Sequence, residues 1–196
     1  RQMCIRDSST AHRTEAGWAY GYPELSAAHR EAIRTGKRIA VPGCYATGFI
    51  TTAYALVAGG ILPKDYPVSA FAVSGYSGGG KKMIAQYQAQ DKEKELSSAR
   101  LYALSQSHKH LKEMKAISGL ERTPLFSPMV TDYYSGMTVS LTFYADMLNG
   151  RQTPETVREY LAKHYAGEKF ITVQPLGAEA ESGGVLFSSA RSGWDG

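Results

Sequence analysis

The chain has 196 residues, of which 43% are apolar and 20% charged, and this composition predicts a globular protein with one large domain, or one domain and part of another. Its 22 Lys and Arg residues are spread among 18 acidic residues, so the net charge of +4 does not indicate nucleic acid, and small phosphorylated ligands explain it equally well. No window approaches the roughly 20 apolar residues of a membrane span, so no membrane partner is expected.

The two cysteines, Cys4 and Cys44, do not form a disulfide framework, and neither lies in a CxxC pattern typical of metal sites. No charged start followed by an apolar segment marks a secretory signal. We therefore expect a cytoplasmic protein with reduced thiols.

Both ends of the chain are unusual. Residues 1–7 show no hydrophobic period and resemble a translated sequencing-adapter remnant. We expect them to be non-native and to pack poorly, including Met3 and Ile5. The other end stops at Trp194-Asp195-Gly196 without a helix or a charged tail, so both ends are expected to be cut rather than natural.

The first ordered elements are a helix, a strand and a second helix. Ser26 can cap a short helix over 27–35. A β-branched run over 39–41 then predicts a strand that ends at a Pro-Gly pair. The next residue, Cys44, opens an apolar segment of helical length over 44–60.

This position gives Cys44 the chemistry of a candidate nucleophile. At a helix N-terminus, the positive end of the macrodipole and the unpaired backbone N–H groups stabilise thiolate over thiol. The same N–H groups can hold a developing oxyanion. A buried, inert cysteine is an equally open interpretation of this residue taken alone.

A second strand over 68–73 leads into a loop rich in glycine and serine. Such a composition lets backbone N–H groups approach a phosphate or pyrophosphate. Because the spacing matches neither GxxxxGK[ST] nor GxGxxG, a flexible loop without a ligand is the alternative. The candidate cofactor-binding residues in this loop are Ser74, Gly75, Ser77, Gly78, Gly79 and Gly80. A polar, partly helical stretch then extends to about Ala99.

The pair His108 and His110 follows strand-like residues at 101–104 and precedes a predicted helix over 111–117. Histidine is the commonest general acid or base, and alternate positions on an extended segment point both imidazoles the same way. We find no further zinc ligands at suitable spacing, so no metal is expected. A surface histidine pair without function is the alternative.

The last third of the chain changes character. Strand-like runs over 125–130 and 137–144 are separated by 133–136, which predicts a hairpin or a longer antiparallel connection. Thr153 caps a further helix, and 170–173 is one more predicted strand. Helices and strands are thus mixed, which indicates an α+β domain after the tail of an α/β one.

Three motifs of this sequence, taken in chain order, closely resemble those of one family. The motifs are Pro42-Gly43-Cys44-Tyr45-Ala46-Thr47, Ser74-Gly75-Tyr76-Ser77-Gly78-Gly79-Gly80-Lys81 and His108-Lys109-His110-Leu111-Lys112-Glu113-Met114. The chain from Ser8 onward resembles N-acetyl-gamma-glutamyl-phosphate reductase of arginine biosynthesis, in its shorter second type. Shorter matches over 9–14 and 20–25 agree with this.

The resemblance implies a Rossmann domain that binds NADP, followed by an α+β catalytic domain of the glyceraldehyde-phosphate and aspartate-semialdehyde dehydrogenase type. By this interpretation residues 8–42 are the end of the Rossmann domain, and residues 43–196 are the catalytic domain, truncated at its C-terminus. The GxxGxxG loop and the C-terminal segment that the family implies are absent. A fragment is therefore expected, inactive by itself, from an enzyme that is a homo-oligomer when full length.

The resemblance also implies the reaction, which is NADPH-dependent reduction of an acyl phosphate to an aldehyde with release of phosphate. Cys44 would attack the acyl phosphate and form a thioester. One of His108 and His110 would move the protons, and the sequence does not decide between them. Arg13 and Ser9 are the candidate substrate-binding residues, Arg13 as a partner for phosphate or carboxylate.

Three other functions stay open from the residues. Another acyl-phosphate reductase, such as aspartate-semialdehyde dehydrogenase, would share the cysteine nucleophile but would not be expected to carry the histidine motif. A cysteine hydrolase could use Cys44 and His110 without a nicotinamide cofactor. A non-enzymatic binding module would leave Cys44 as an ordinary thiol in an apolar pocket.

Overall fold

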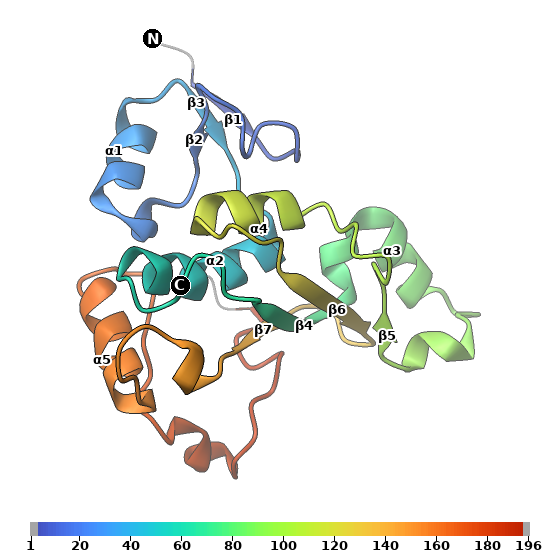
Figure 1. Cartoon of the computed structure of the whole chain (residues 1–196). Coiled ribbons are helices and arrows are strands. Elements are labelled where there is room, and N and C mark those ends of the chain that lie inside the picture. Colours follow the sequence, from blue (N-terminus) through green and yellow to red (C-terminus); the bar gives the residue numbers. More distant parts are fainter. Residues whose placement is uncertain (1–3, 194–196) are drawn as a thin grey trace.

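The computed structural model describes residues 4–193, in which two β-sheets lie on either side of a pair of helices (Figure 1). The smaller sheet is parallel with strand order β1-β3-β2, and its strands are β1 (Ile5–Asp7), β2 (Ala19–Tyr20) and β3 (Arg38–Ala40). A 3-10 turn, η1 (Pro23–Leu25), and helix α1 (Ala27–Thr35) connect β2 to β3. This βαβ unit has the α/β organisation expected for the first part of the chain.

Helix α1 begins where the sequence predicted. The Ser26 side chain accepts a hydrogen bond from the His29 N–H, which satisfies one of the unpaired donors of the first turn. The cap residue at the other end is Gly36.

The segment Ile5–Asp7 is more ordered than we expected from the sequence. Its backbone pairs with β3, and hydrogen bonds from Ile5 N–H to Lys37 O and from Val41 N–H to Asp7 O extend the pairing. The Ile5 side chain is nevertheless 52% exposed. Met3 lies outside the described residues, and the non-native origin of 1–7 stays a prediction.

The larger sheet has four strands in the order β5-β6-β4-β7, and they are β4 (Ser69–Gly75), β5 (Arg100–Leu101), β6 (Leu125–Thr131) and β7 (Met137–Thr142). Strands β4 and β6 are parallel, whereas β7 is antiparallel to β4 and β5 is antiparallel to β6. Of the two connections predicted at 133–136, the hairpin is wrong, because β4 lies between β6 and β7, whereas the longer connection between antiparallel strands is confirmed. The connecting loop crosses the end of β4 and accepts hydrogen bonds from Gly75 and Tyr76.

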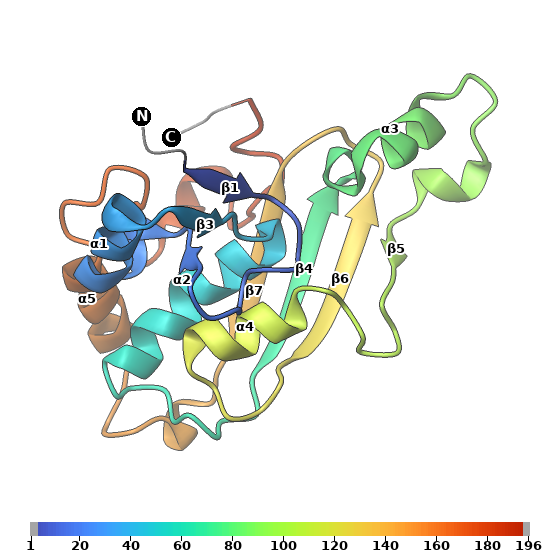
Figure 2. The same ribbon diagram turned by 90° about the horizontal axis from the view of Figure 1, so that it is seen from above.

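The helices are α2 (Cys44–Ala58), α3 (Gly80–Gln88), α4 (Leu111–Ser118) and α5 (Pro154–His164), and the short 3-10 turns are η2 (Tyr76–Gly79), η3 (Lys94–Ser97), η4 (Ala145–Met147) and η5 (Ala178–Ser182). Helix α2 contacts α4, α5 and β7. Its fully buried Phe49 and Ile50 pack in one core with Met114 of α4 and Phe126 of β6. This packing joins the start of α2 to the start of α4. In Figure 2, α3 projects beyond the ends of β4 and β6, whereas β5 lies alongside β6.

Two further predicted elements are shorter or absent. The strand predicted at 101–104 is only the two-residue β5, and the helical stretch predicted to reach Ala99 ends at Gln88. The predicted strand at 170–173 is wrong, since Arg158 donates hydrogen bonds to the carbonyls of Val173 and Gln174, which a strand would offer to a neighbour. No helix within residues 4–193 is long and apolar enough to cross a membrane.

Candidate active site

Cys44 is the first residue of α2, and its position follows from the glycine before it. Gly43 is extended (φ −78°, ψ 147°), and its carbonyl accepts hydrogen bonds from the backbone and the side chain of Thr47. The Cys44 side chain is exposed and lines a cavity of about 520 Å³. An exposed thiol at the N-terminus of a 15-residue helix is placed for nucleophilic attack rather than for core packing.

Both histidines reach the same cavity, although more than sixty residues separate them from Cys44 in the sequence. Cys44, His108 and His110 therefore converge on one cavity. The two imidazoles meet edge to face with ring centroids 4.7 Å apart. The backbone N–H of His110 donates a hydrogen bond to His108 Nδ1 at 3.1 Å. The Nε2 side of His110 faces Gly43, the residue next to the nucleophile.

His110 is the more perturbed of the two. Burial, reinforced by the charges of His108, Arg13 and Lys109, lowers the pKa of His110 to about 3, and burial also lowers the pKa of His108. His110 Nδ1 is buried and has no hydrogen-bond partner among the described residues. An imidazole with a pKa this low is neutral near pH 7 but is a weak base, so it is the position of His110 beside Gly43, rather than its basicity, that makes it a candidate for moving the thiol proton.

Glu113 lies at the centre of the buried polar network behind the cavity. Its carboxylate pairs with Arg13 (Nη1 to Oε1, 2.6 Å) and accepts hydrogen bonds from the hydroxyl of Tyr20 at 3.0 Å and from the Gly43 N–H at 3.2 Å. Burial and the Glu113 charge together raise the pKa of Tyr20 well above its ordinary value. We did not assign Glu113 a role from the sequence, although its place three residues after His110 puts both on one side of α4.

Tyr45 forms the apolar wall beside the histidines. Its ring contacts His108, His110 and Phe126 edge to face, with centroids 5.9, 6.1 and 5.3 Å apart. Its hydroxyl is 2.6 Å from the Ser74 hydroxyl, and burial raises the pKa of Tyr45. The buried Ser74 side chain, which also lines the cavity, therefore already has one partner within the protein.

The glycine-rich loop lines the same cavity as Cys44, but much of its backbone is already hydrogen-bonded. The N–H groups of Gly75, Tyr76 and Ser77 donate to carbonyls of the loop at 133–136. These three N–H groups therefore have acceptors within the chain, and cofactor binding by this loop stays a prediction. Gly80 does not line the cavity, whereas Ser74, Gly75, Ser77, Gly78 and Gly79 do.

The two residues predicted to bind substrate differ in their surroundings. Arg13 lines the cavity, but its guanidinium donates to Val41 O at 2.9 Å and to Ser8 O at 3.1 Å besides the pair with Glu113. Ser9 does not line the cavity, and its hydroxyl donates to the Asp7 carboxylate at 2.7 Å. The structure therefore does not place Ser9 at the candidate site.

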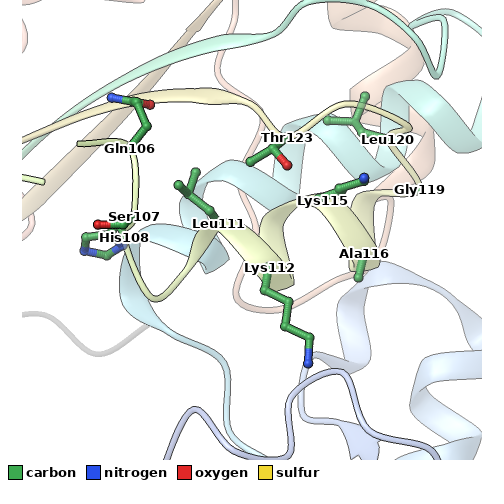
Figure 3. A pocket seen from close by; sticks show the side chains of 10 residues that line it. All are labelled: Gln106, Ser107, His108, Leu111, Lys112, Lys115, Ala116, Gly119, Leu120 and Thr123. Atoms are coloured by element: carbon green, nitrogen blue, oxygen red, sulfur yellow. The ribbon is translucent and has the colours of Figure 1, made fainter. Parts of the chain in front are cut away.

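A second depression, of about 540 Å³, lies along α4 (Figure 3). It shares His108 with the first cavity and contains Lys112 and Lys115, but Cys44 does not line it. Within residues 4–193 no three His, Cys, Asp or Glu side chains are grouped to hold a metal ion. The cavity at Cys44 is accordingly the candidate active site.

Comparison with known proteins agrees with this geometry. Residues 44–189 match the family described as the semialdehyde dehydrogenase dimerisation domain, and this range begins at Cys44 itself. The chain belongs to this family. The α+β fold expected of the semialdehyde dehydrogenase type is thereby confirmed.

Relatives within this family have informative names. The chain is 41% identical to N-acetyl-gamma-glutamyl-phosphate reductase 2 of a Nostoc species, over 89% of the chain and 56% of the relative. It is 44% identical to the N-acetyl-gamma-glutamyl-phosphate reductases of Sinorhizobium fredii, over 89% of the chain and 57% of the relative, and of Rhizobium meliloti, over 90% and 57%. The resemblance stated from the motifs is confirmed, and the chain spans little more than half the length of these relatives.

Solved structures show the same fold at low sequence identity. The aspartate semialdehyde dehydrogenase of Francisella tularensis superposes with a TM-score of 0.59 at 13% identity, over 83% of this chain and 56% of that one. Aspartate semialdehyde dehydrogenase II of Vibrio cholerae gives 0.57 at 14% identity, over 81% and 52%. These semialdehyde dehydrogenases share the architecture with the chain.

Proposed function

We propose that the chain is the catalytic part of an oxidoreductase that reduces N-acetyl-gamma-glutamyl phosphate to its 5-semialdehyde with release of phosphate. The observation that carries this proposal is the exposed Cys44 thiol at the N-terminus of α2, in one cavity with a neutral, buried His110. The names of the relatives supply the substrate. These names favour the proposed reaction over those of an aspartate-semialdehyde dehydrogenase or a cysteine hydrolase.

The first chemical step uses residues of this chain alone. The Cys44 sulfur bonds to the acyl carbon, the bond from carbon to the phosphate oxygen breaks, and its electron pair leaves with phosphate. The thiol proton passes to His110, whose Nε2 side faces the start of α2. The N–H groups at that helix end stabilise the oxyanion of the tetrahedral intermediate. A thioester on Cys44 results.

The second step needs a hydride, which NADPH supplies when bound. The cavity edge at Gly78 suits a flat ring, because a Cβ added there would meet no atom within 4 Å. Ser77, Gly78 and Gly79 would hold that end of the cofactor, and in the relatives' architecture a further domain would hold the rest. His110 returns its proton to the oxygen of the reduced carbon, and the thiol is regenerated when the aldehyde leaves.

The test is acylation of the chain itself, followed by mass spectrometry. N-acetyl-gamma-glutamyl phosphate should add one acyl group, labile to hydroxylamine as a thioester is, and Cys44→Ser should abolish it. Cys4→Ser is the matched control, since Cys4 is also an exposed thiol and lies outside the cavity. Acylation that persists in Cys44→Ser would contradict the proposal. NADPH oxidation by the same variants of the full-length protein tests the reductase step.

We also infer that the full-length protein is a homo-oligomer in which a second copy covers the open face of the larger sheet. On that face Phe71 of β4 is 43% exposed, Leu125 of β6 62% and Leu101 of β5 50%. Large exposed apolar side chains gathered on one face of a sheet mark an interaction site, and the family description names dimerisation.

Molar mass in solution tests this interface. Phe71→Glu should shift the protein to monomer. The control Leu104→Glu changes a side chain that is 77% exposed and lies outside the sheet, so it should leave the mass unchanged. An unaltered oligomer in Phe71→Glu would place the interface elsewhere.

A further inference from the structure

The cavity around Cys44 has an unbalanced charge. Its lining residues include the cationic Arg13 and Lys109, and no Asp or Glu is among those described. A low-dielectric pocket with one sign of charge concentrates ligands of the opposite sign. The arrangement suits an anionic substrate, so the question is which side chain binds the anionic group of that substrate.

Arg13 is already neutralised. It is buried, its guanidinium is paired with the Glu113 carboxylate at 2.6 Å, and its Nε and Nη2 groups donate to two backbone carbonyls. A substrate phosphate would have to displace Glu113, and this would leave a buried carboxylate without its partner. Arg13 therefore belongs to the framework of the site.

The two histidines do not supply the positive charge that would bind the anionic group either. Burial lowers the pKa of both imidazoles, so they are neutral near pH 7. Lys109 lines the cavity together with both histidines, and its charge contributes to the lowered pKa of each imidazole. Lys109 itself makes no ion pair with any residue of the described chain.

We propose that Lys109 is the phosphate-binding residue of the Cys44 cavity and determines its preference for acyl phosphates over other acyl donors. This inference rests on the proposed function and deepens it. A lysine ammonium is a point charge with three donors, and it binds phosphate oxygens well. When the Cys44 sulfur bonds to the acyl carbon, the phosphate oxygen gains the electron pair of the broken bond. An ammonium at that oxygen stabilises the leaving group more than the bound substrate.

The experiment compares two small acyl donors on the same thiol. Acetyl phosphate carries the phosphate group and no carboxylate, whereas p-nitrophenyl acetate carries the same acyl group and no phosphate. The rate of Cys44 acylation is followed by intact mass in the wild-type chain, Lys109→Gln and Lys109→Arg. The matched control is Lys112→Gln, which removes a lysine that pairs with the exposed Glu15 and does not line the cavity.

We expect Lys109→Gln to lower the rate with acetyl phosphate about tenfold or more, as loss of a charge-assisted hydrogen bond does, and to change the rate with p-nitrophenyl acetate less than about twofold. Lys109→Arg should recover part of the rate, and Lys112→Gln should match wild type. An equal loss with both donors would overturn the inference, because Lys109 would then act on the thiol. Equal rates in wild type and Lys109→Gln would also overturn it.

A second measurement separates this inference from the proposed function. Inorganic phosphate should slow alkylation of Cys44 by iodoacetamide in the wild-type chain and not in Lys109→Gln. If acetyl phosphate does not acylate Cys44 but this protection depends on Lys109, the anion site stands and the proposed function fails. If phosphate protects the wild-type chain and Lys109→Gln equally, or protects neither, the role of Lys109 is refuted, whichever reaction Cys44 catalyses.

Discussion

The backbone N–H of Gly43 donates to Glu113 Oε2 at 3.2 Å, a contact between residues 70 positions apart. Gly43 immediately precedes the candidate nucleophile Cys44, and Glu113 lies in the first turn of α4, just after His110. One hydrogen bond thus joins the start of the helix that carries the thiol to the start of the helix that follows the base. The relative position of the two reacting groups depends on this carboxylate.

Replacing Glu113 should be strongly destabilising. Glu113→Gln leaves the buried Arg13 guanidinium without a countercharge, and breaking one partner of a buried pair costs about 3–5 kcal/mol of unfolding free energy. Urea unfolding measures the loss. The control is Glu15→Gln, which breaks the exposed pair of Glu15 with Lys112 and should cost less than about 1 kcal/mol. Similar losses in both variants would contradict a special role for the buried pair.

The sequence predicted the local elements of this site well, because each has a local signal. Ser26 marked the start of α1, and the apolar segment from Cys44 predicted α2 to within a residue or two. The two histidines were recognised from their spacing and residue type. In each case the deciding interaction lies within a few residues of the signal.

The non-local parts could not be predicted in the same way. Strand β7 pairs with β4 rather than with β6, and nothing in the short loop between β6 and β7 encodes that choice. Arginine is a residue type that often binds anionic ligands, but the partner of Arg13 in the structure is Glu113, which is 100 residues away in the sequence. Single-sequence patterns report propensity and periodicity, whereas long-range pairs depend on the assembled fold.

The space around Gly43 should be essential. A Cβ added there would lie 2.6 Å from Arg13 Nη1 and would overlap the His110 imidazole. Gly43→Ala should therefore cost about 1–3 kcal/mol of stability by overpacking and slow Cys44 acylation. Gly78→Ala is the matched control in the same cavity, because a Cβ there would meet nothing within 4 Å. Wild-type acylation and stability in Gly43→Ala would show that the contact can relax.

Gln106 should anchor the loop that leads to the histidines. Its side-chain amide donates to Phe126 O at 2.9 Å and accepts from Phe126 N–H at 2.8 Å, so it extends the pairing of β6 beyond the short β5. Its backbone is left-handed (φ 56°), which costs a non-glycine residue some free energy. Gln106→Ala should speed hydrogen exchange of the Phe126 amide and destabilise the protein by about 1–2 kcal/mol.

A matched variant isolates the two hydrogen bonds of Gln106. Gln106→Glu keeps an acceptor for the Phe126 N–H and loses the donor to the Phe126 carbonyl. We expect the Phe126 amide to stay protected in this variant while stability falls. Unchanged exchange at Phe126 in Gln106→Ala would mean that the loop does not depend on this side chain.

Stability should fall in mild acid because of His110. Its pKa is about 3 in the folded chain, through burial and the charges of His108, Arg13 and Lys109, against about 6.5 in an unfolded chain. Between these values the unfolded state binds more protons, so the unfolding free energy is unaffected above pH 6.5 and decreases as the pH falls toward 3, by at most about 1.4 kcal/mol per pH unit for this group. Urea midpoints between pH 7 and 5 should fall less in His110→Gln than in wild type. An undiminished slope in His110→Gln would assign the acid sensitivity to other groups.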